Sequence, residues 1–370
     1  MEDFFHGLPV PIKGENPGPT WIHNGLAEKR ARRNWPKEYG HDILLTIETT
    51  DKCTLRCDHC FAESGPENNT FIGHKKIEEV AKDCEKLFPQ YKNRIIRITG
   101  GDPLLHPKVF DIVKSFSKRK KKLQYELLDV ETNGWWAKDD KTTRQYVRKL
   151  KAAGADLLSM TLDYFHCKQG IFDIDDHSDR IRRIAREEGL KFRKIKTGRG
   201  TRTPDEKTAK ELEEHKKTCK KCNGLPNITP IGRARELPEK TWGDHRPCGG
   251  VGCRLTPPVF TTVVGPEKYT HTDEVTLGPN GNVYPCNSGK EFEHASLAIG
   301  NVYKRPLAHI ISNPENKIVD IIRNEGLRGV SKRAGMTPWT HWNTYWKMSP
   351  CGLCHELLRN HGEKIQKKIK

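Results

Sequence analysis

Three closely spaced cysteines are the clearest candidate for a chemical site in this sequence. Cys53, Cys57 and Cys60 are separated by three and two residues, so one short loop can hold their thiolates around a metal centre before the metal binds. A structural zinc site usually takes four ligands in paired short spacings, and this loop contains no fourth cysteine. The spacing therefore favours an iron–sulfur cluster that leaves one iron open. Zinc completed by His59 or by a remote histidine, and chance, are the alternatives.

The elements that must position these cysteines follow a strand–helix rhythm. Short apolar runs with β-branched residues recur at 43–49, 95–99, 125–132, 157–162, 191–195 and 227–231. Between them, apolar residues at helical spacing predict helices, the first of which carries Ile77, Val80, Ala81, Cys84 and Leu87. This alternation predicts a parallel sheet covered by helices, open or closed into a barrel, with the cysteine loop directly after the first strand.

A C-x3-C-x2-C loop in that place resembles the signature of the radical S-adenosylmethionine (SAM) enzymes. An aromatic residue commonly precedes the third cysteine in this family, and His59 stands there. Further resemblances lie at the ends of later strands, in Gly100-Gly101-Asp102-Pro103, Glu131-Thr132-Asn133-Gly134, Thr161-Leu162-Asp163 and Ile231-Gly232-Arg233-Ala234. The resemblance covers residues 41–235 approximately. It implies an α/β fold with a partial (β/α)6 TIM-type barrel, whose active site lies at the carboxyl ends of the strands.

This resemblance also implies the cofactors and the reaction. Cys53, Cys57 and Cys60 would hold three irons of a 4Fe–4S cluster, and SAM would chelate the open iron. Reductive cleavage of SAM would give a 5′-deoxyadenosyl radical that abstracts hydrogen from a substrate. The residues implied to contact the cofactors are His59, Gly100, Gly101, Asp102, Asn133, Thr161, Asp163 and Arg233. Asp102 replaces the Glu that is usual in the family, and Thr161 replaces the usual Ser.

The C-terminal part of the chain carries seven of the 12 cysteines. A hairpin that ends at Cys286, the segment 299–302 and the later pair Cys351 and Cys354 resemble the SPASM domain, or its shortened twitch form. The resemblance implies a smaller α+β domain that binds an auxiliary 4Fe–4S cluster. The ligands that we expect for it are Cys253, Cys286, Cys351 and Cys354, with Cys248 as a competitor for the place of Cys253.

Cys219 and Cys222 form a further C-x2-C pair after a charged helical segment. The pair can join Cys248 and Cys253 in a four-thiol zinc or iron–sulfur site, and its flanking lysines favour thiolates. The alternative, which has the same weight, is that these two thiols bind no metal.

Three residues outside these groups have less specific signals. Cys84 lies on the apolar face of a predicted helix and is expected to pack in the core. His166 and Cys167 follow the fourth predicted strand, where either can face the active site. His166 suits a general acid or base near the substrate. A histidine bonded to backbone and a structural thiol are the alternatives.

Composition divides the 370 residues into three predicted parts. Residues 1–40 are rich in Pro and Gly and are expected to form an N-terminal extension, and the strand–helix rhythm changes after about residue 245. The resemblance implies that residues 41–245 form the radical SAM core domain and residues 246–370 the auxiliary-cluster domain. No apolar run is long enough to span a membrane, and the acidic start at Glu2 and Asp3 is unlike a secretory signal. These features predict a cytoplasmic protein whose cysteines stay reduced.

The net charge of +17 favours encounter with an anionic partner. An acidic peptide, RNA, or an acidic electron donor such as a flavodoxin or ferredoxin fits that charge, although no segment resembles an RNA-binding module with stacking aromatics. Because many enzymes with a SPASM-like domain mature peptides, the favoured interpretation is a radical SAM enzyme that modifies a peptide or protein side chain. A small molecule or RNA is the alternative substrate. A non-catalytic zinc or redox-binding protein is the alternative of another class.

Overall fold

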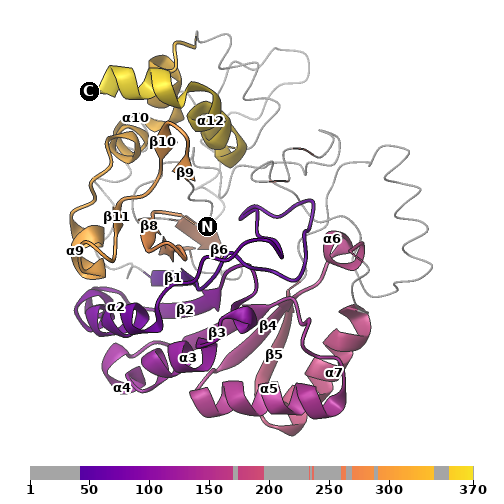
Figure 1. Ribbon diagram of the computed structural model, residues 1–370. Coiled ribbons are helices and arrows are strands. Elements are labelled where there is room, and N and C mark those ends of the chain that lie inside the picture. Colours follow the sequence, from indigo (N-terminus) through magenta and orange to yellow (C-terminus); the bar gives the residue numbers. More distant parts are fainter. Residues whose placement is uncertain are drawn as a thin grey trace, which may run out of the picture.

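Five parallel strands lie side by side in sequence order and carry the cysteine loop at their carboxyl edge (Figure 1). The structure is a computed structural model, which describes residues 42–169, 174–195, 233, 236, 260–263, 269–286, 291–336 and 350–369. The strands are β1 (Asp42–Glu48), β2 (Arg94–Thr99), β3 (Leu127–Thr132), β4 (Leu157–Thr161) and β5 (Lys191–Ile195). All four pairings between them are parallel, which confirms the predicted α/β sheet.

Helices follow the first four of these strands and cover one face of the sheet. They are α2 (His74–Leu87), α3 (Val109–Ser117), α4 (Lys120–Leu123), α5 (Asp140–Ala153), α6 (Tyr164–Cys167) and α7 (Ile174–Glu187), with 3-10 turns η1 (Phe88–Gln90) and η2 (Pro103–Leu105). The apolar positions of α2 all face the core, and Cys84 is fully buried among them, as the sequence predicts. The expected strand at 227–231 lies outside the described residues.

Alternation along the strands separates an apolar face from a polar face. Ile43, Leu45 and Ile47 of β1 are fully buried in the core beneath the helices. The alternate positions include Thr46 and Glu48, and the strand register places Thr46 beside Arg97 of β2 and Arg97 beside Asp129 of β3. The face turned away from the helices is therefore lined by charged and hydroxyl side chains, as suits the inner side of a partial barrel.

The C-terminal part continues the same sheet. Its strands are β6 (Phe260–Val263), β7 (Tyr269–Leu277), β8 (Asn282–Tyr284) and β11 (Gly300–Asn301), and a separate small ribbon is formed by β9 (Glu291–Phe292) and β10 (Ala295–Ser296). β7 pairs in parallel with β1, so that Leu45 lies opposite Val275. β6 and β8 then pair antiparallel with β7. The auxiliary part is thus joined to the barrel edge by backbone hydrogen bonds.

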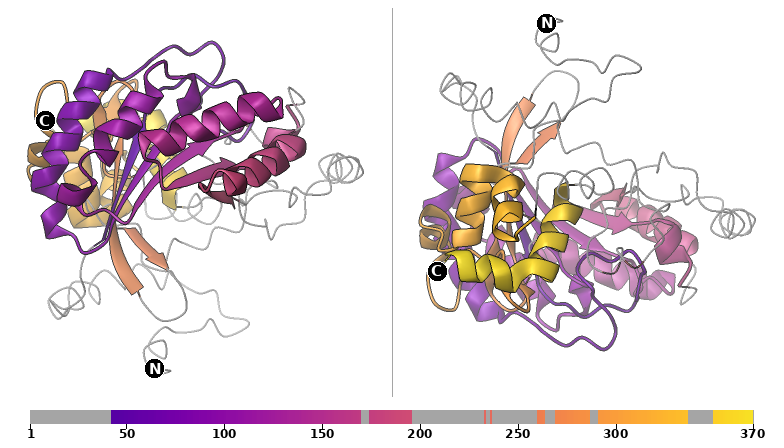
Figure 2. Two further views of the ribbon diagram at one scale, coloured as in Figure 1. Left: turned by 90° about the horizontal axis from the view of Figure 1, so that it is seen from below. Right: turned by 90° about the horizontal axis from the view of Figure 1, so that it is seen from above.

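Three further helices complete the C-terminal part: α9 (Leu307–Ser312), α10 (Lys317–Arg333) and α12 (Pro350–Ile369). α9 packs on α2, and the Leu307 amide donates to Asp83 Oδ2 at 2.7 Å. α10 packs on α12 at one end of the molecule (Figure 1). Seen from above, these two helices face the viewer, whereas the helices of the first part face the viewer from below (Figure 2). Among the described residues, no helix has both the length and the apolar character needed to cross a membrane.

A candidate cluster and cofactor site

The three cysteines of the first cluster lie in a loop that leaves the carboxyl end of β1. Cys53 and Cys57 are buried and Cys60 is half-buried, and all three contact an apolar group formed by Leu55, Tyr164 and Phe165. The Cys60 amide donates to the Cys57 carbonyl at 3.1 Å, which closes the turn between them. The structure therefore gathers the three predicted ligands in one apolar niche, partly covered by α6.

Two glycines after β2 hold the start of this loop by direct backbone contact. The Gly101 amide donates to the Thr50 carbonyl at 2.7 Å, and the Asp102 amide donates to the Lys52 carbonyl at 2.8 Å. A Cβ atom on Gly100 would lie 2.4 Å from the Thr50 carbonyl oxygen, and one on Gly101 would lie 2.2 Å from that of Lys52. No side chain fits at either position, because backbone atoms fill the space.

Asp102 and Asn133 connect this contact to the end of β3. Asp102 is fully buried, and its carboxylate accepts from the Leu104 amide at 2.9 Å, the Thr132 hydroxyl at 2.7 Å and the Asn133 amide at 2.9 Å. Burial raises the pKa of Asp102 to about 6, against the opposing effect of these hydrogen bonds. The Asn133 side-chain amide donates to Cys53 Sγ at 3.4 Å. These residues support the loop that carries Cys53, Cys57 and Cys60, which we call the cluster loop. Their contacts with SAM stay a prediction.

Arg233 binds the other side of the loop with three hydrogen bonds. Its Nε donates to the Cys57 carbonyl at 3.0 Å, its Nη2 to the Ser64 carbonyl at 2.6 Å, and its backbone amide to the Cys60 carbonyl at 3.1 Å. A guanidinium with its donors in a fixed fork suits such a multiple contact. Arg233 therefore holds the cluster loop in place through these three hydrogen bonds.

The electrostatics of the three thiols fit a bound cationic cluster. Burial, followed by the nearby Asp102, raises the pKa of Cys53 to about 12. Burial raises the pKa of Cys57 still further, the other two thiols and Asp163 add to it, and Arg233 opposes them. Three thiolates this close together, two of them buried, need a positive centre to remain ionised. Iron atoms of a 4Fe–4S cluster supply that charge, so the donor set fits the group.

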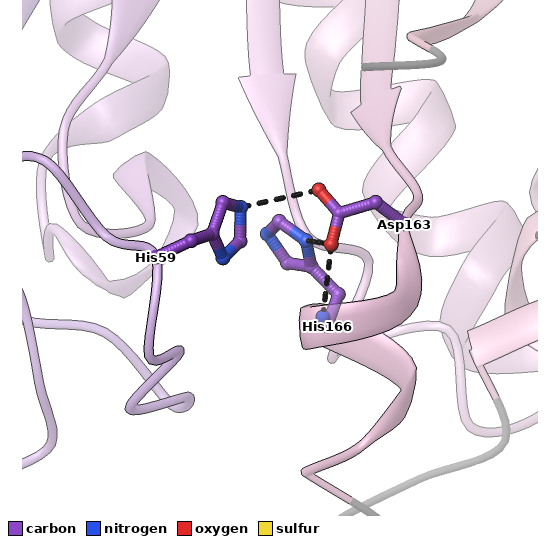
Figure 3. A group of neighbouring side chains, drawn as sticks. All are labelled: His59, Asp163 and His166. Atoms are coloured by element: carbon purple, nitrogen blue, oxygen red, sulfur yellow. Dashed lines mark hydrogen bonds and ion pairs between the residues drawn. The ribbon is translucent and has the colours of Figure 1, made fainter. Parts of the chain in front are cut away.

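His59, Asp163 and His166 form a compact group beside the cysteine loop. His59 Nε2 lies 3.2 Å from Asp163 Oδ2, and His166 Nδ1 lies 2.9 Å from Asp163 Oδ1. Figure 3 shows both imidazoles turned toward the carboxylate. Asp163 also caps α6 by accepting from the His166 amide at 3.1 Å. The His59 ring stacks on Phe165, with ring centroids 4.8 Å apart.

Charge pairing sets the protonation of this group. Burial lowers the pKa of His166, but the ionised Asp163 outweighs burial and holds it above its usual value. For Asp163 burial raises the pKa, while the two histidines pull it well below its usual value. The three side chains converge closely enough to share one metal ion, and they also suit proton transfer at the edge of the cofactor site.

Polar residues of the inner barrel face extend the site below the loops, and sequence reasoning missed most of them. Thr161, which was expected to contact the cofactor, donates to Glu131 Oε1 at 3.0 Å. Arg97 Nε lies 3.4 Å from Glu131 Oε2, and Arg193 donates to Asp129 Oδ2 at 2.8 Å. Charged residues alternating with buried apolar ones inside predicted strands were the signal that could have found them.

The expected ligands of the second cluster are described only in part. Cys286 and Cys354 are buried in the main core, and Cys351 is half-buried at the start of α12. Burial, and then the neighbouring Cys351, raises the pKa of Cys354 above its usual range. The remaining candidates, Cys219, Cys222, Cys248 and Cys253, lie outside the described residues, so the ligand set stays a prediction.

Comparisons with known proteins agree with these features. The radical SAM superfamily model matches residues 47–195, and the model of the SPASM iron-sulfur cluster-binding domain matches residues 269–338. GTP 3′,8-cyclase of Listeria welshimeri is 31% identical over 129 residues, which cover 34% of this chain and 34% of that protein. The alignment thus spans about a third of the length of this curated relative.

Two solved structures are also similar. The structure of anSMEcpe with bound SAM is 12% identical, with a TM-score of 0.47, over 88% of this chain and 95% of that one. Streptococcus suis SuiB bound to the precursor peptide SuiA is 13% identical, with a TM-score of 0.36, over 86% and 76%. The radical SAM domain implies a 4Fe–4S cluster and SAM, and the SPASM domain implies auxiliary clusters. The chain therefore carries a radical SAM domain over residues 47–195 and a SPASM iron–sulfur cluster-binding domain over residues 269–338.

Proposed function

We propose that this protein cleaves SAM reductively at a 4Fe–4S cluster held by Cys53, Cys57 and Cys60, and abstracts hydrogen from a peptide or protein side chain. One observation carries the first part of this proposal. The three thiols, two of them buried and one half-buried, lie together after the carboxyl end of β1, in a loop that Gly101 and Arg233 hold by hydrogen bonds.

The bound cluster and SAM supply the 5′-deoxyadenosyl radical, and the chain orients and shields them. Asn133 donates to Cys53 Sγ and Arg233 adds positive charge beside Cys57, and both effects favour thiolates over neutral thiols. The apolar group around the cysteines keeps water from the reacting centre. His166, held by Asp163, is the proposed acid or base.

The substrate class rests on the C-terminal part. The SPASM match and the pairing of β7 with β1 support a peptide, since they place an auxiliary domain directly beside the barrel edge. The second candidate is a small molecule, because the similar curated protein of Listeria welshimeri is named GTP 3′,8-cyclase. An auxiliary 4Fe–4S cluster on Cys253, Cys286, Cys351 and Cys354 and an acidic flavodoxin or ferredoxin as electron donor complete the proposal.

The radical reaction is tested by anaerobic reconstitution with iron and sulfide, followed by dithionite and SAM. Chromatography should detect 5′-deoxyadenosine from the wild type and none from Cys57→Ala, whereas Cys84→Ala, which changes a buried thiol outside the site, should retain the product. Product from Cys57→Ala would show that the proposal is wrong. Mass spectrometry of candidate peptides and of GTP, each incubated with the protein, SAM and reductant, then separates a peptide substrate from a nucleotide.

A further inference from the structure

A cavity of about 220 Å³ opens between the cluster loop and the β7–β8 hairpin. Its walls come from the end of β1, the residues just after Cys60, the hairpin turn and β9. Of the residues predicted to contact SAM, only Gly100 lines it. The cavity therefore adjoins the proposed cofactor site but is built from a different set of side chains.

The charge of this cavity is opposite to that of the whole protein. Glu48, Asp51 and Glu291 line it, and the lining residues that the structure describes include no Lys, Arg or His, although the chain carries a net charge of +17. Asp51 uses Oδ1 to accept from the Thr70 amide at 2.7 Å. Its Oδ2 has no hydrogen bond or ion pair with any residue that the structure describes. The cavity walls thus concentrate negative charge with unused acceptor capacity.

Glu291, which lines another wall of the cavity, also has one carboxylate oxygen with hydrogen bonds and one without. Its Oε1 accepts from the Asn282 amide group at 2.9 Å, the Tyr284 hydroxyl at 3.2 Å and the Ser296 hydroxyl at 2.8 Å. Within the described part of the chain, its Oε2 has no partner. Three donors fix the orientation of this carboxylate, so that a cation meets it without reordering the side chain.

A buried hydroxyl provides an independent sign of a missing ligand. Ser64 lines the cavity and is only 2% exposed, and its Oγ has no hydrogen-bond partner among the residues that the structure describes. Burying a hydroxyl without a partner is costly, and native proteins rarely leave one unsatisfied. A donor group in the cavity would satisfy it. Phe61, which is 44% exposed, adds an apolar wall and an aromatic face suited to a cation with an alkyl chain.

We propose that this cavity binds an alkylammonium or guanidinium group, such as the end of a lysine or arginine side chain of the substrate. The inference rests on the proposed function for its link to a substrate and deepens it, because it gives the substrate a cationic anchor beside the cluster loop. Carboxylates attract such a group and repel the phosphates of a nucleotide. A primary amine also brings three donors, enough for both free carboxylate oxygens and for Ser64.

Binding of n-butylammonium and n-butylguanidinium to the anaerobically reconstituted protein tests the assignment by calorimetry, with n-butanol as the neutral probe. Asp51→Asn and Glu291→Gln remove one charge each and keep the internal acceptor. Each should raise Kd about tenfold, and the two together by more. Glu67→Gln is the matched control, because this exposed carboxylate lies on the same loop, pairs with Arg56 and does not line the cavity. Equal affinity for n-butanol, or unchanged affinity in both cavity variants, overturns the proposal.

Ser64→Ala supplies a second readout that a purely structural hydroxyl would not give. Removal of an unpartnered hydroxyl should leave the melting temperature unchanged or higher, while Kd for n-butylammonium rises about threefold to tenfold. A lower melting temperature with unchanged Kd contradicts the assignment. Formation of 5′-deoxyadenosine is measured in the same samples. Cation binding without this product means that only the proposed function fails, and product without cation binding means that only the cavity assignment fails.

Discussion

At the scale of single residues, Arg233 gathers several roles in one side chain. Its guanidinium donates to the carbonyls of Cys57 and Ser64 and places a positive charge beside the thiols, while its backbone amide donates to the Cys60 carbonyl. Partners of this kind, one step removed from the metal, orient the ligands and tune the potential of a cluster. Asn133 acts on Cys53 in a related way, because its side-chain amide donates a hydrogen bond to Cys53 Sγ.

We predict that Arg233→Gln lowers the rate of SAM cleavage on the order of tenfold to a hundredfold. The cluster should also retain less iron and be harder to reduce, because a positive charge near it is lost. Iron analysis and a redox titration followed by electron paramagnetic resonance measure both effects. Arg56→Gln is the control, since it removes a charge from the same loop. Within the described part of the chain the Arg56 side chain pairs only with the exposed Glu67, and its backbone amide donates to Gln169 Oε1. If the two variants have the same cleavage rate, iron content and reduction potential, Arg233 has no specific effect on the cluster.

A second residue-scale prediction concerns pH. Asp163 holds the pKa of His166 above its usual value of 6.5, although burial acts in the opposite direction. The folded state therefore binds the His166 proton more tightly than the unfolded state does. This stabilisation is complete below about pH 6.5 and is lost as the pH rises through the raised pKa.

The free energy of unfolding of the wild type, relative to His166→Gln, should accordingly fall as the pH rises above 6.5, by about 1.4 kcal/mol for each unit of pKa shift. Denaturant unfolding between pH 5 and pH 9, approximately, measures it. His106→Gln is a control of opposite sign, because burial lowers the pKa of His106. If the difference in free energy of unfolding between the wild type and His166→Gln does not change with pH, Asp163 does not stabilise the charged form of His166.

At the scale of elements, the loops after β1, β2 and β3 support one another through backbone contacts. The cysteine loop passes so close to Gly100 and Gly101 that neither can carry a side chain. Asp102 then ties the same turn to Thr132 and Asn133 after β3. The position of the thiols is therefore set by three neighbouring strand ends, and a change in one is transmitted to the others.

Gly101→Ala should displace the cysteine loop, because its Cβ would meet the Lys52 carbonyl oxygen at 2.2 Å. We expect the free energy of unfolding to drop by about 1–3 kcal/mol and the iron content after reconstitution to fall with it. Gly73→Ala is a matched control, since its Cβ would lie 3.6 Å from the Tyr303 hydroxyl, an ordinary contact. Normal iron content in Gly101→Ala would mean that the loop tolerates the shift.

At the scale of the whole molecule, two cysteine-bearing parts share one sheet. β7 continues the barrel edge through its pairing with β1, and α12, which begins with Cys351 and Cys354, packs against β9 and β10. Arg359 of α12 lies 3.7 Å from Glu63 of the cluster loop, so that the two parts also touch through an ion pair. On the helical side of the sheet, Lys118 pairs with Glu78 and Lys120 pairs with Asp156.

The double substitution Cys351→Ala/Cys354→Ala should lower the iron content by about half, because one of two four-iron clusters is lost. Colorimetric iron analysis per protein chain measures it. Cys84→Ala, which alters a fully buried thiol of α2, should leave the count unchanged. An undiminished iron content in the double variant would exclude these two cysteines as cluster ligands.

The sequence by itself determined the local features. The spacing of Cys53, Cys57 and Cys60, the apolar faces of the helices and the five strands up to residue 195 all depend on neighbours close in the chain, and the structure confirms the helices and strands. Two C-terminal helices escaped prediction. In α12 the buried residues include Leu353, Leu357 and Leu358, a helical spacing that was masked by its high content of charged residues.

Only the tertiary structure decided which distant groups meet. Arg233 reaches the Cys57 carbonyl across 176 positions of sequence, and β7 joins β1 across the whole barrel domain. The acidic cavity combines Asp51 and Ser64 with Glu291, which belongs to another part of the chain. Spacing along the chain carries no information about such contacts, because they form only when packing brings strand ends and loops to one edge of the sheet. The thiols could therefore be predicted from the sequence, whereas the side chains that surround them became known only from the fold.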